Sequence, residues 1–397
     1  MSVADFDADV RMVQALGTRV PCTIVRGGSS KGVYVESSAI PPPGPERDAL
    51  VLRLFGSPDK RQIDGLGGAD KLTSKVAVMG PPSRADCDVD YLFGQVNIEL
   101  PRIDWKSNCG NLSAGAAHYA VAAGYVRSDE PVVPVRIHQV NTGRRLLARV
   151  PLRAGLPEPA GTFAIGGVPG SGARIELDFG DFAGCTLGRG LLPTGNVRDA
   201  YDVPGVGPVE LSVVDMANLC IFVRDRDVGL DDARDVTALG ADAAVIARLE
   251  SVRATVAAAL GYISGPDAAQ ELLVRMNPLL FIVAAPRAYG ALNGERIEAA
   301  AHDIHARSIT RAAFSKAYPG TGSIGTAIAC GIPGTVAFAA LAEPPAVGTP
   351  YRVRIGHPGG TMTVRAMTRA EGDAVVAASA VVGRTARTLM SGVAYVD

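Results

Sequence analysis

The chain has 397 residues, of which 47% are hydrophobic and only 5% aromatic. This length predicts about two or three domains. The 46 glycines suit cores in which small side chains pack against closely spaced backbones. Lys and Arg (39 together) almost balance Asp and Glu (40), which gives a net charge of −1. Because no stretch concentrates basic residues with aromatic ones, we expect no nucleic-acid partner.

The sequence also shows no targeting segment and no metal motif. The acidic stretch Met1–Asp9 lacks the basic and apolar regions of a signal peptide, and no apolar run approaches the roughly 18 residues of a membrane span. His302 and His305 have no third ligand close by in sequence, so we predict no metal. We expect neither a zinc site nor a disulfide framework from the scattered cysteines, which are Cys22, Cys87, Cys109, Cys185, Cys220 and Cys330. A soluble cytoplasmic protein that does not bind membranes is therefore expected.

After a loose polar leader over residues 1–18, the first pattern is a strand, a Gly-rich loop and a second strand. The strands are predicted over Val20–Val25 and Val33–Val35, on either side of the loop Arg26–Gly32. This loop lacks the GxxxxGK[ST] order and no helix pattern follows it, which argues against a nucleotide. Successive glycines let backbone amides turn toward one anion. We therefore expect Ser29 and Ser30 to bind a carboxylate.

Lys75 begins an apolar strand directly after a second Gly-rich loop, which itself follows a surface helix predicted over 45–58. A lysine at such a point is usually solvated. A lysine that faces a pocket instead loses part of its hydration, and this makes it a usable base. The sequence leaves both interpretations open. A further strand over Val89–Ile98 leads to the next element.

Ser107–Asn111 is the polar head of a small-residue segment that ends at Gly124. Good N-cap types and the glycine stop predict a helix from about 109 to 123. Because this segment has no polar face, we expect protein on all sides of it. Cys109 would lie in its first turn, where unsatisfied N–H groups and the helix dipole favour a thiolate or a bound carboxylate. The alternative is a plain buried cysteine that acts as a small hydrophobe.

The rest of the chain predicts mostly strands, with an interdomain crossing near residues 183–205, where Gly and Pro are frequent. These strands are expected over 132–140, 145–150, 175–179, 208–215, 219–223, 279–284, 350–356, 361–366 and 376–382. One apolar stripe at helical spacing predicts a surface helix and consists of Val245, Leu249, Val252, Val256 and Leu260.

The pattern around Cys109 returns over Tyr318–Cys330, where a polar, Gly-rich head again runs into a small-residue apolar helix. Two halves built alike predict a duplicated fold, with the two helix N-termini facing one another across a cleft. Residues 320–325 also match the dinucleotide pattern GxGxxG. That interpretation requires an apolar strand just before the glycines, whereas 311–318 is mixed and helical, so an NAD-linked oxidoreductase is disfavoured.

A set of motifs in a fixed order resembles the PrpF family, from residue 19 to the C-terminus. The motifs are Arg26–Gly32, Gln62–Gly68 with Thr73–Lys75, Asp88–Gln95, Asp104–Trp105 with Asn108–Asn111, Leu192–Asn196 and Gly356–Thr361. The resemblance implies an α+β fold like that of diaminopimelate epimerase, in which two similar domains each wrap a curved, mostly antiparallel sheet around a central helix. We place these domains at 19–188, with C-terminal strands near 376–397 packing on it, and at 189–375.

Relatives in this family include 2-methylaconitate isomerase, 4-oxalomesaconate tautomerase, and methylitaconate and aconitate Δ-isomerases. The resemblance implies that a double bond of an unsaturated di- or tricarboxylate moves by allylic proton transfer, without a cofactor and with Lys75 and Cys109 as the acid/base residues. By pattern, Thr321 takes the place of the second thiol of racemase relatives, so a two-thiol racemisation is disfavoured. The expected substrate-binding residues are Ser29, Ser30, Asn108, Gly110, Asn111, Thr321, Gly322, Ser323 and His357.

Two other functions stay open. One is an epimerase that acts on an amino or hydroxy acid, and the other is a carboxylate-binding accessory protein of an aconitase-like enzyme. Motifs shared by all the relatives do not choose among the polycarboxylates. A homodimer is left open as well.

Overall fold

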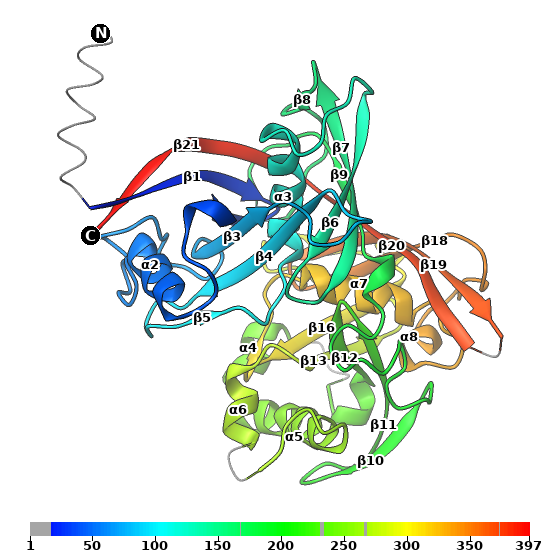
Figure 1. Cartoon of the computed structure of the whole chain (residues 1–397). Helices are drawn as coiled ribbons and strands as arrows, with labels where there is room; N and C mark the ends of the chain where they lie inside the picture. The colour runs from blue at the N-terminus through cyan, green and yellow to red at the C-terminus, as the bar shows by residue number, and fades with distance from the viewer. Residues whose placement is uncertain (1–16, 167, 231–233, 266–267, 373) are drawn as a thin grey trace, which may run out of the picture. The chain divides into compact units, whose positions relative to one another are not determined.

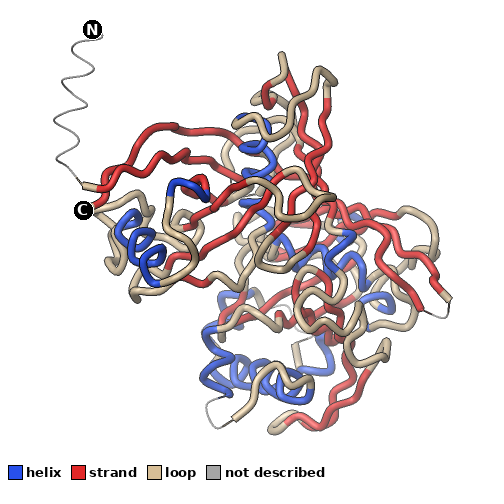
Figure 2. Tube along the Cα trace, viewed as in Figure 1, coloured by secondary structure: helices blue, strands red, loops and turns tan. Residues whose placement is uncertain are grey.

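The computed structural model describes residues 17–397 apart from 167, 231–233, 266–267 and 373. The polar leader expected over 1–18 therefore lies almost wholly outside the described residues. The chain divides into two compact units: unit 1 ends at Glu176 and takes in Arg384–Asp397, while unit 2 is Leu177–Gly383. In the described part of each unit, strands outweigh helices (Figure 2).

Unit 1 is a twisted sheet with helices packed on it (Figure 1). In the order in which they pair, its strands run β21–β1–β2–β3–β4–β6–β7; β2–β3 and β4–β6 are parallel, and the other pairs are antiparallel. Its elements are β1 (Thr18–Gly27), β2 (Ser30–Glu36), α2 (Pro45–Phe55), β3 (Lys75–Gly80), β4 (Val89–Val96), β5 (Ile103–Asp104), α3 (Gly110–Ala122), β6 (Val132–Gln139), β7 (Arg144–Arg153), β8 (Leu156–Pro157) and β21 (Ala386–Val396).

Side-chain alternation along β3 separates the two layers of unit 1. Val76 and Val78 point to one face, where they join Leu50 and Phe55 of α2 in a buried apolar cluster. Lys75, one position earlier, therefore points to the opposite face. That face is covered by α3, which contacts β1, β2, β3 and β4 and is buried along nearly its whole length. The prediction of a central helix enclosed by protein is confirmed.

Unit 2 repeats this plan. Its strands pair in the order β10–β11–β12–β13–β16–β18–β19–β20, with β12–β13 and β16–β18 parallel and the others antiparallel. Its elements are β10 (Asp199–Val203), β11 (Gly207–Met216), β12 (Asn218–Arg224), α4 (Val236–Ala241), α5 (Ala243–Ala259), α6 (Ala268–Val274), β13 (Leu279–Ala284), β14 (Tyr289–Gly290), β15 (Arg296–Ile297), β16 (Ile304–Thr310), β17 (Ala313–Phe314), α7 (Gly320–Ala329), α8 (Val336–Ala339), β18 (Tyr351–His357), β19 (Gly360–Glu371) and β20 (Ala374–Arg384). β9 (Ile175–Asp178) crosses the boundary between the units.

The pairing order from β21 to β7 matches that from β10 to β19, with β20 as an additional strand of unit 2, and this match confirms the predicted duplication. From β1 to β7 the directions alternate antiparallel, parallel, antiparallel, parallel, antiparallel, and β11, β12, β13, β16, β18 and β19 repeat this sequence. In this correspondence α7 is equivalent to α3, and α4–α6 take the place of α2. The fold class predicted from the sequence is therefore correct.

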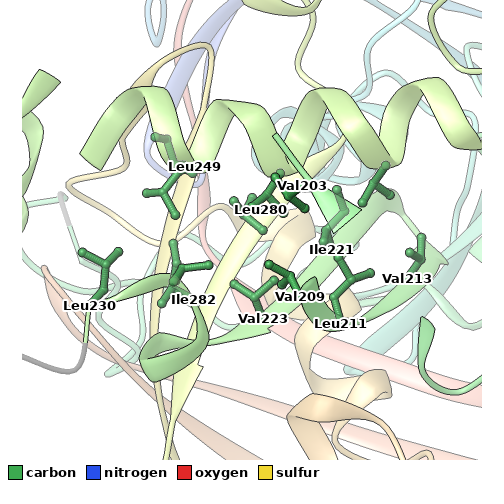
Figure 3. Close-up of a cluster of buried hydrophobic side chains, with 14 of the residues drawn as sticks. Val203, Val209, Leu211, Val213, Ile221, Val223, Leu230, Leu249, Leu280 and Ile282 are labelled. Carbon is green, nitrogen blue, oxygen red and sulfur yellow. The ribbon is translucent and has the colours of Figure 1, made fainter. Parts of the chain in front are cut away.

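Most predicted elements are present, with shifted ends. The stripe from Val245 to Val256 is the buried side of α5, which packs on the sheet of unit 2 through the apolar cluster in Figure 3. The surface helix expected over 45–58 is α2, and it ends at Phe55 because Gly56 turns into the left-handed region (φ +67°). Residues 183–205, where an interdomain crossing was expected, lie inside unit 2.

Close approach of backbones holds the β1–β2 hairpin against α3. Tyr34 on β2 is fully buried, and its hydroxyl donates to the Leu112 carbonyl at 2.8 Å. A methyl group at Gly115 would overlap that hydroxyl, and one at Gly27 would overlap the backbone of α3. Glycine is therefore required at both positions by the space available rather than by backbone conformation.

We expect Gly115→Ala to destabilise the protein by about 1–3 kcal/mol, because the added methyl forces Tyr34 away from Leu112. Urea unfolding measures this loss. Gly240→Ala in α4 is the matched control, since nothing lies near its added methyl and alanine favours helix. If Tyr34→Phe does not recover part of the stability lost in Gly115→Ala, the overlap is not the cause.

His118 on α3 makes the stability of unit 1 depend on pH. Its Nε2 lies 3.0 Å from the Thr388 hydroxyl, and burial, aided by Arg26, lowers its pKa from 6.5 to about 4. As pH falls below 6.5 the unfolded chain binds this proton first, so stability present above pH 6.5 is lost as pH falls toward 4.

Between pH 7 and pH 5 we expect wild type to lose about 2 kcal/mol more unfolding free energy than His118→Gln. Urea unfolding of both proteins at the two pH values gives the difference. An equal loss in both proteins would contradict this assignment.

Candidate active site

Cys109 is the N-cap residue of α3, so it stands just outside the first turn in which it was expected. Its backbone is extended (φ −138°, ψ 99°), and its carbonyl accepts the first intrahelical hydrogen bond, from Ser113 N at 3.0 Å. This makes the helix one residue shorter at each end than the predicted 109–123. The thiol is half-buried and makes no capping hydrogen bond. The first N–H groups of a helix have no acceptor within it, so Cys109 adjoins a site that favours an anion.

The tip of the β1–β2 hairpin contacts the start of α3. Gly28 has φ +54°, and a side chain there would overlap Asn111, which donates through Nδ2 to Ser29 Oγ at 3.1 Å. Ser30 Oγ is buried and has no hydrogen-bond partner among the described residues. The predicted Gly-rich loop is thus a tight hairpin turn, in which Ser29 is engaged with Asn111 and Ser30 keeps an unused hydroxyl.

Arg384 is a site neighbour that the sequence interpretation missed. It comes from the end of β20, and its Nε donates to Asn111 Oδ1 at 3.1 Å. Burial lowers its pKa to about 10. The guanidinium is therefore still charged near neutral pH and adds positive charge to the start of α3. No local motif signals this residue, because its neighbours in space lie far away in sequence.

Lys75 is buried, with only 7% of its surface exposed, so the interpretation as a solvated residue is wrong. Its Nζ donates to Gln95 Oε1 at 2.7 Å and lies 5.0 Å from the centre of the Phe93 ring. Gly32 separates the Lys75 backbone from Leu112, and a methyl at Gly32 would contact both. Lys75 and the start of α3 are thereby on the same side of the sheet in unit 1.

Two buried phenols complete this side of unit 1. Burial raises the pKa of Tyr34 and of Tyr91 well above the usual value. Both phenols therefore stay neutral, and neither supplies a base near neutral pH.

In unit 2, the start of α7 corrects the predicted equivalence of Thr321 and Cys109. Ser323 N donates to Pro319 O at 2.9 Å, just as Ser113 N donates to Cys109 O. The N-cap that corresponds to Cys109 is therefore Pro319, which lies two residues before Thr321. A simple alignment of Gly-rich heads missed this, because only the first helical hydrogen bond fixes the register.

Thr321 corresponds instead to Asn111, and it has the same role toward its hairpin. Thr321 Oγ1 accepts from Asn218 Nδ2 at 2.5 Å, and Asn218 begins β12 as Ser30 begins β2. Because the hydroxyl accepts this bond, its own hydrogen is left to donate elsewhere. The expected binding residue thus retains one donor.

The next two residues of α7 are committed to packing. A methyl at Gly322 would overlap the Phe281 ring, and the Ser323 hydroxyl donates to Gly320 O at 2.7 Å. Both residues are buried. Their backbone and side-chain groups hold the helix start together.

His357 lies beside the segment that leads into α7. Its ring centre is 5.6 Å from that of Tyr318, and its Nδ1 accepts from Gly359 N at 3.1 Å. Burial lowers its pKa to about 4, so the ring is neutral at pH 7. With Nδ1 accepting, the proton is assigned to Nε2, which is a donor. His357 therefore orders its loop and offers one N–H.

The predicted site residues fall into two groups, and each group is built within one unit. Ser29, Ser30, Lys75 and 108–111 belong to unit 1, whereas 321–323 and His357 belong to unit 2. That the two helix starts face one another stays a prediction.

A separate cavity of about 520 Å³ lies in unit 2. None of the predicted site residues lines it. It is lined by four arginines, three of which pair with carboxylates; the pairs are Arg234–Asp242 at 3.0 Å, Arg287–Asp225 at 2.9 Å and Arg296–Glu298 at 2.9 Å. Most of the lining's positive charge is thus offset, and we assign no ligand to this cavity.

Among the residues that the structure describes, no group of three or more His, Cys, Asp or Glu side chains is arranged to hold a metal ion. His302 and His305 are buried with ring centres 6.0 Å apart. None of the described helices has the length and apolar character needed to span a membrane.

Known proteins with similar sequences are isomerases. The chain is 38% identical over 380 residues to 3-methylitaconate isomerase of Eubacterium barkeri, covering 96% of this chain and 97% of that protein. It is 35% identical over 386 residues to 2-methyl-aconitate isomerase of Shewanella oneidensis (94% and 96%). It is 38% identical over 376 residues to 4-oxalomesaconate tautomerase of Pseudomonas putida (95% and 96%).

Solved structures show the same fold. A crystal structure of methylitaconate-delta-isomerase superposes with a TM-score of 0.84 at 37% identity, covering 96% of both chains. A hydroxyproline epimerase from Agrobacterium vitis superposes with a TM-score of 0.52 at 11% identity, covering 95% of this chain and 92% of that one, which shows a shared fold alone. The family model described as PrpF protein matches residues 17–397, and the chain belongs to this family.

Proposed function

We propose that this isomerase moves the double bond of a small unsaturated di- or tricarboxylate by allylic proton transfer, with Lys75 and Cys109 as the two acid/base residues. The similarity to three isomerases of such acids, each over at least 94% of this chain, supports the reaction class. The single observation that carries the residue assignment is a buried lysine and a half-buried thiol on one side of the unit 1 sheet.

The reaction balances with one proton removed and one returned. Lys75, as the neutral amine, takes a proton from the carbon next to the double bond. The C–H electron pair becomes the new double bond, and the old double-bond pair shifts toward the far carbon, which receives a proton from Cys109. The charge in between spreads into a conjugated carboxylate, and such charge requires donors that are already in place.

Groups at the start of α3 suit that negative charge. The first N–H groups of the helix, including that of Gly110, point out of its N-terminus, and the buried guanidinium of Arg384 is held beside them by Asn111. The unused Ser30 hydroxyl adds a donor. Asn108, directly before the thiol, is half-buried and completes this set in unit 1.

In unit 2, Thr321 and His357 stay predicted substrate-binding residues, and each retains one donor. The asymmetry of the two N-caps favours transfer between two different carbons over epimerisation at one carbon. An epimerase of the two-thiol type would need a second acid/base side chain where this chain has Pro319. The relatives act on different acids, so the substrate is chosen by assay from methylitaconate, 2-methylaconitate, 4-oxalomesaconate and aconitate.

Lys75→Ala is expected to abolish net isomerisation, whereas Cys109→Ser should reduce it by about a hundred- to ten-thousand-fold, because a serine hydroxyl is far less acidic than a thiol. Proton NMR in deuterated water follows both the product and the exchange of the substrate proton. We expect Cys109→Ser to keep proton exchange, since abstraction and its reversal need only Lys75.

Losses of only about threefold in both folded variants would place the chemistry elsewhere. If wild type exchanges no substrate proton with any acid of the panel, the carboxylate-binding accessory function is favoured instead.

Cys109 should react with iodoacetamide faster than the other cysteines, and substrate should protect it. Cys185 is the matched control because it is also half-buried. Burial raises the pKa of the remaining thiols, that of Cys87 to about 11, which slows their alkylation. Mass spectrometry of timed samples gives each rate; equal rates for Cys109 and Cys185, or for Cys109 and Cys330, would contradict a reactive Cys109.

A further inference from the structure

Gln95 is the direct cross-strand partner of Lys75. The antiparallel register of β3 and β4 places the two residues opposite one another, so their side chains leave the sheet on the same face. Lys75 Nζ donates to Gln95 Oε1 at 2.7 Å. Phe93, two residues earlier on β4, supplies the ring that lies 5.0 Å from the same nitrogen.

The amide of Gln95 is itself held in one orientation. Its Nε2 donates to the carbonyls of Ser74 at 2.9 Å and Lys71 at 3.1 Å. An amide nitrogen can only donate and these carbonyls can only accept, so the oxygen of the amide must turn toward Lys75. The acceptor that Lys75 meets is therefore fixed by the backbone at the end of the preceding loop.

We propose that Gln95 is a positioning residue for the base, an inference that rests on the proposed role of Lys75. Its amide oxygen accepts one N–H of Lys75 whether the amine is charged or neutral. In the neutral amine the lone pair then points away from Gln95. Because the acceptor is an uncharged amide, it orients Lys75 without the strong preference for the ammonium that a carboxylate in this place would impose.

The repeat in unit 2 shows that the fold does not require this pair. The strands that correspond to β3 and β4 are β13 and β16, and Leu279 begins β13 as Lys75 begins β3, one position before the residue that faces the outer helices (Leu280 in β13, Val76 in β3). Leu279 is buried and apolar. A Lys–Gln pair thus occurs in the unit that also carries Cys109, where a base is needed.

Other titratable groups lie on the same side of the sheet and bear on any pH test. They are Tyr34 on β2, Tyr91 on β4, Asp104 on β5 and Cys109 before α3. Both tyrosines stay neutral, since their pKa values are raised well above the usual value. Asp104 accepts from the Ser107 hydroxyl and from Lys106 N. A change confined to residue 95 leaves all four in place.

The test compares Gln95→Glu with Gln95→Met. The substrate is the acid that wild type turns over fastest among methylitaconate, 2-methylaconitate, 4-oxalomesaconate and aconitate. In Gln95→Glu, the added carboxylate favours the ammonium, so the acidic limb of the kcat/KM profile should move up by about one pH unit or more. Gln95→Met removes the acceptor but keeps the length of the side chain. It should lower kcat about tenfold or more while KM changes less than about threefold.

A purely structural defect would lower activity at every pH and leave the profile in place. The inference is overturned if the Gln95→Glu profile superposes on that of wild type, or if Gln95→Met keeps at least half of the wild-type kcat. Lys75→Ala distinguishes a failure of the proposed function from a failure of the role assigned to Gln95. If it retains isomerisation, the proposed function itself fails; if it is inactive while the Gln95→Glu profile does not move, only the role of Gln95 fails.

Discussion

Unit 1 depends on the burial of a helix that has no polar face. α3 is enclosed along nearly its whole length, so its neighbours must approach its backbone closely, and Gly27 and Gly115 make that approach possible. Enclosure also fixes where the helix ends can meet a ligand. At the N-terminal turn, whose first N–H groups have no acceptor within the helix, Asn111 contacts Ser29 and Arg384. The same packing that stabilises the unit therefore places positive partial charge beside Cys109.

The two units share one architecture but differ in the side chains that could take part in chemistry. Strand directions and pairing order agree in the two units, and so does the bond from the first Ser N of each central helix to its N-cap carbonyl. The side chains at the matching positions differ: Cys109 corresponds to Pro319, and Asn111 to Thr321. Asn111 and Thr321 both hold a hairpin, which is a structural task that either side chain performs. The chemical difference lies at the N-cap, where one unit has a thiol and the other has none.

Local sequence patterns predicted much of the fold, but they predicted less of the candidate site. Apolar spacing predicted α5, and the small-residue segments predicted α3 and α7, because burial along a helix leaves a signal within a few residues. Lys75 was left undecided, since one residue at a strand start carries no such signal. Its burial depends on which face of β3 meets α3, and that is set by contacts between distant segments.

Sequence reasoning could not predict which side chains form hydrogen bonds across the sheet. Gln95 stood in a family motif without a role, although its position at an even offset from Tyr91 and Phe93 already put it on the α3 face. The bond to Lys75 needs the register of two strands, and the orientation of its amide needs two carbonyls of the preceding loop. Arg384 reaches Asn111 from the other end of the chain.

A buried lysine that works as a base must satisfy two opposing demands. Burial leaves its N–H groups in need of an acceptor, and an unsatisfied donor in such a place is costly. A carboxylate would satisfy them, but it would also stabilise the ammonium and keep the lone pair unavailable. A fixed amide oxygen accepts an N–H of the buried lysine, and it stabilises the ammonium less than a carboxylate would. The Lys75–Gln95 bond, with an aromatic ring beside it, has this composition, whereas the apolar Leu279 at the matching position of unit 2 faces neither demand.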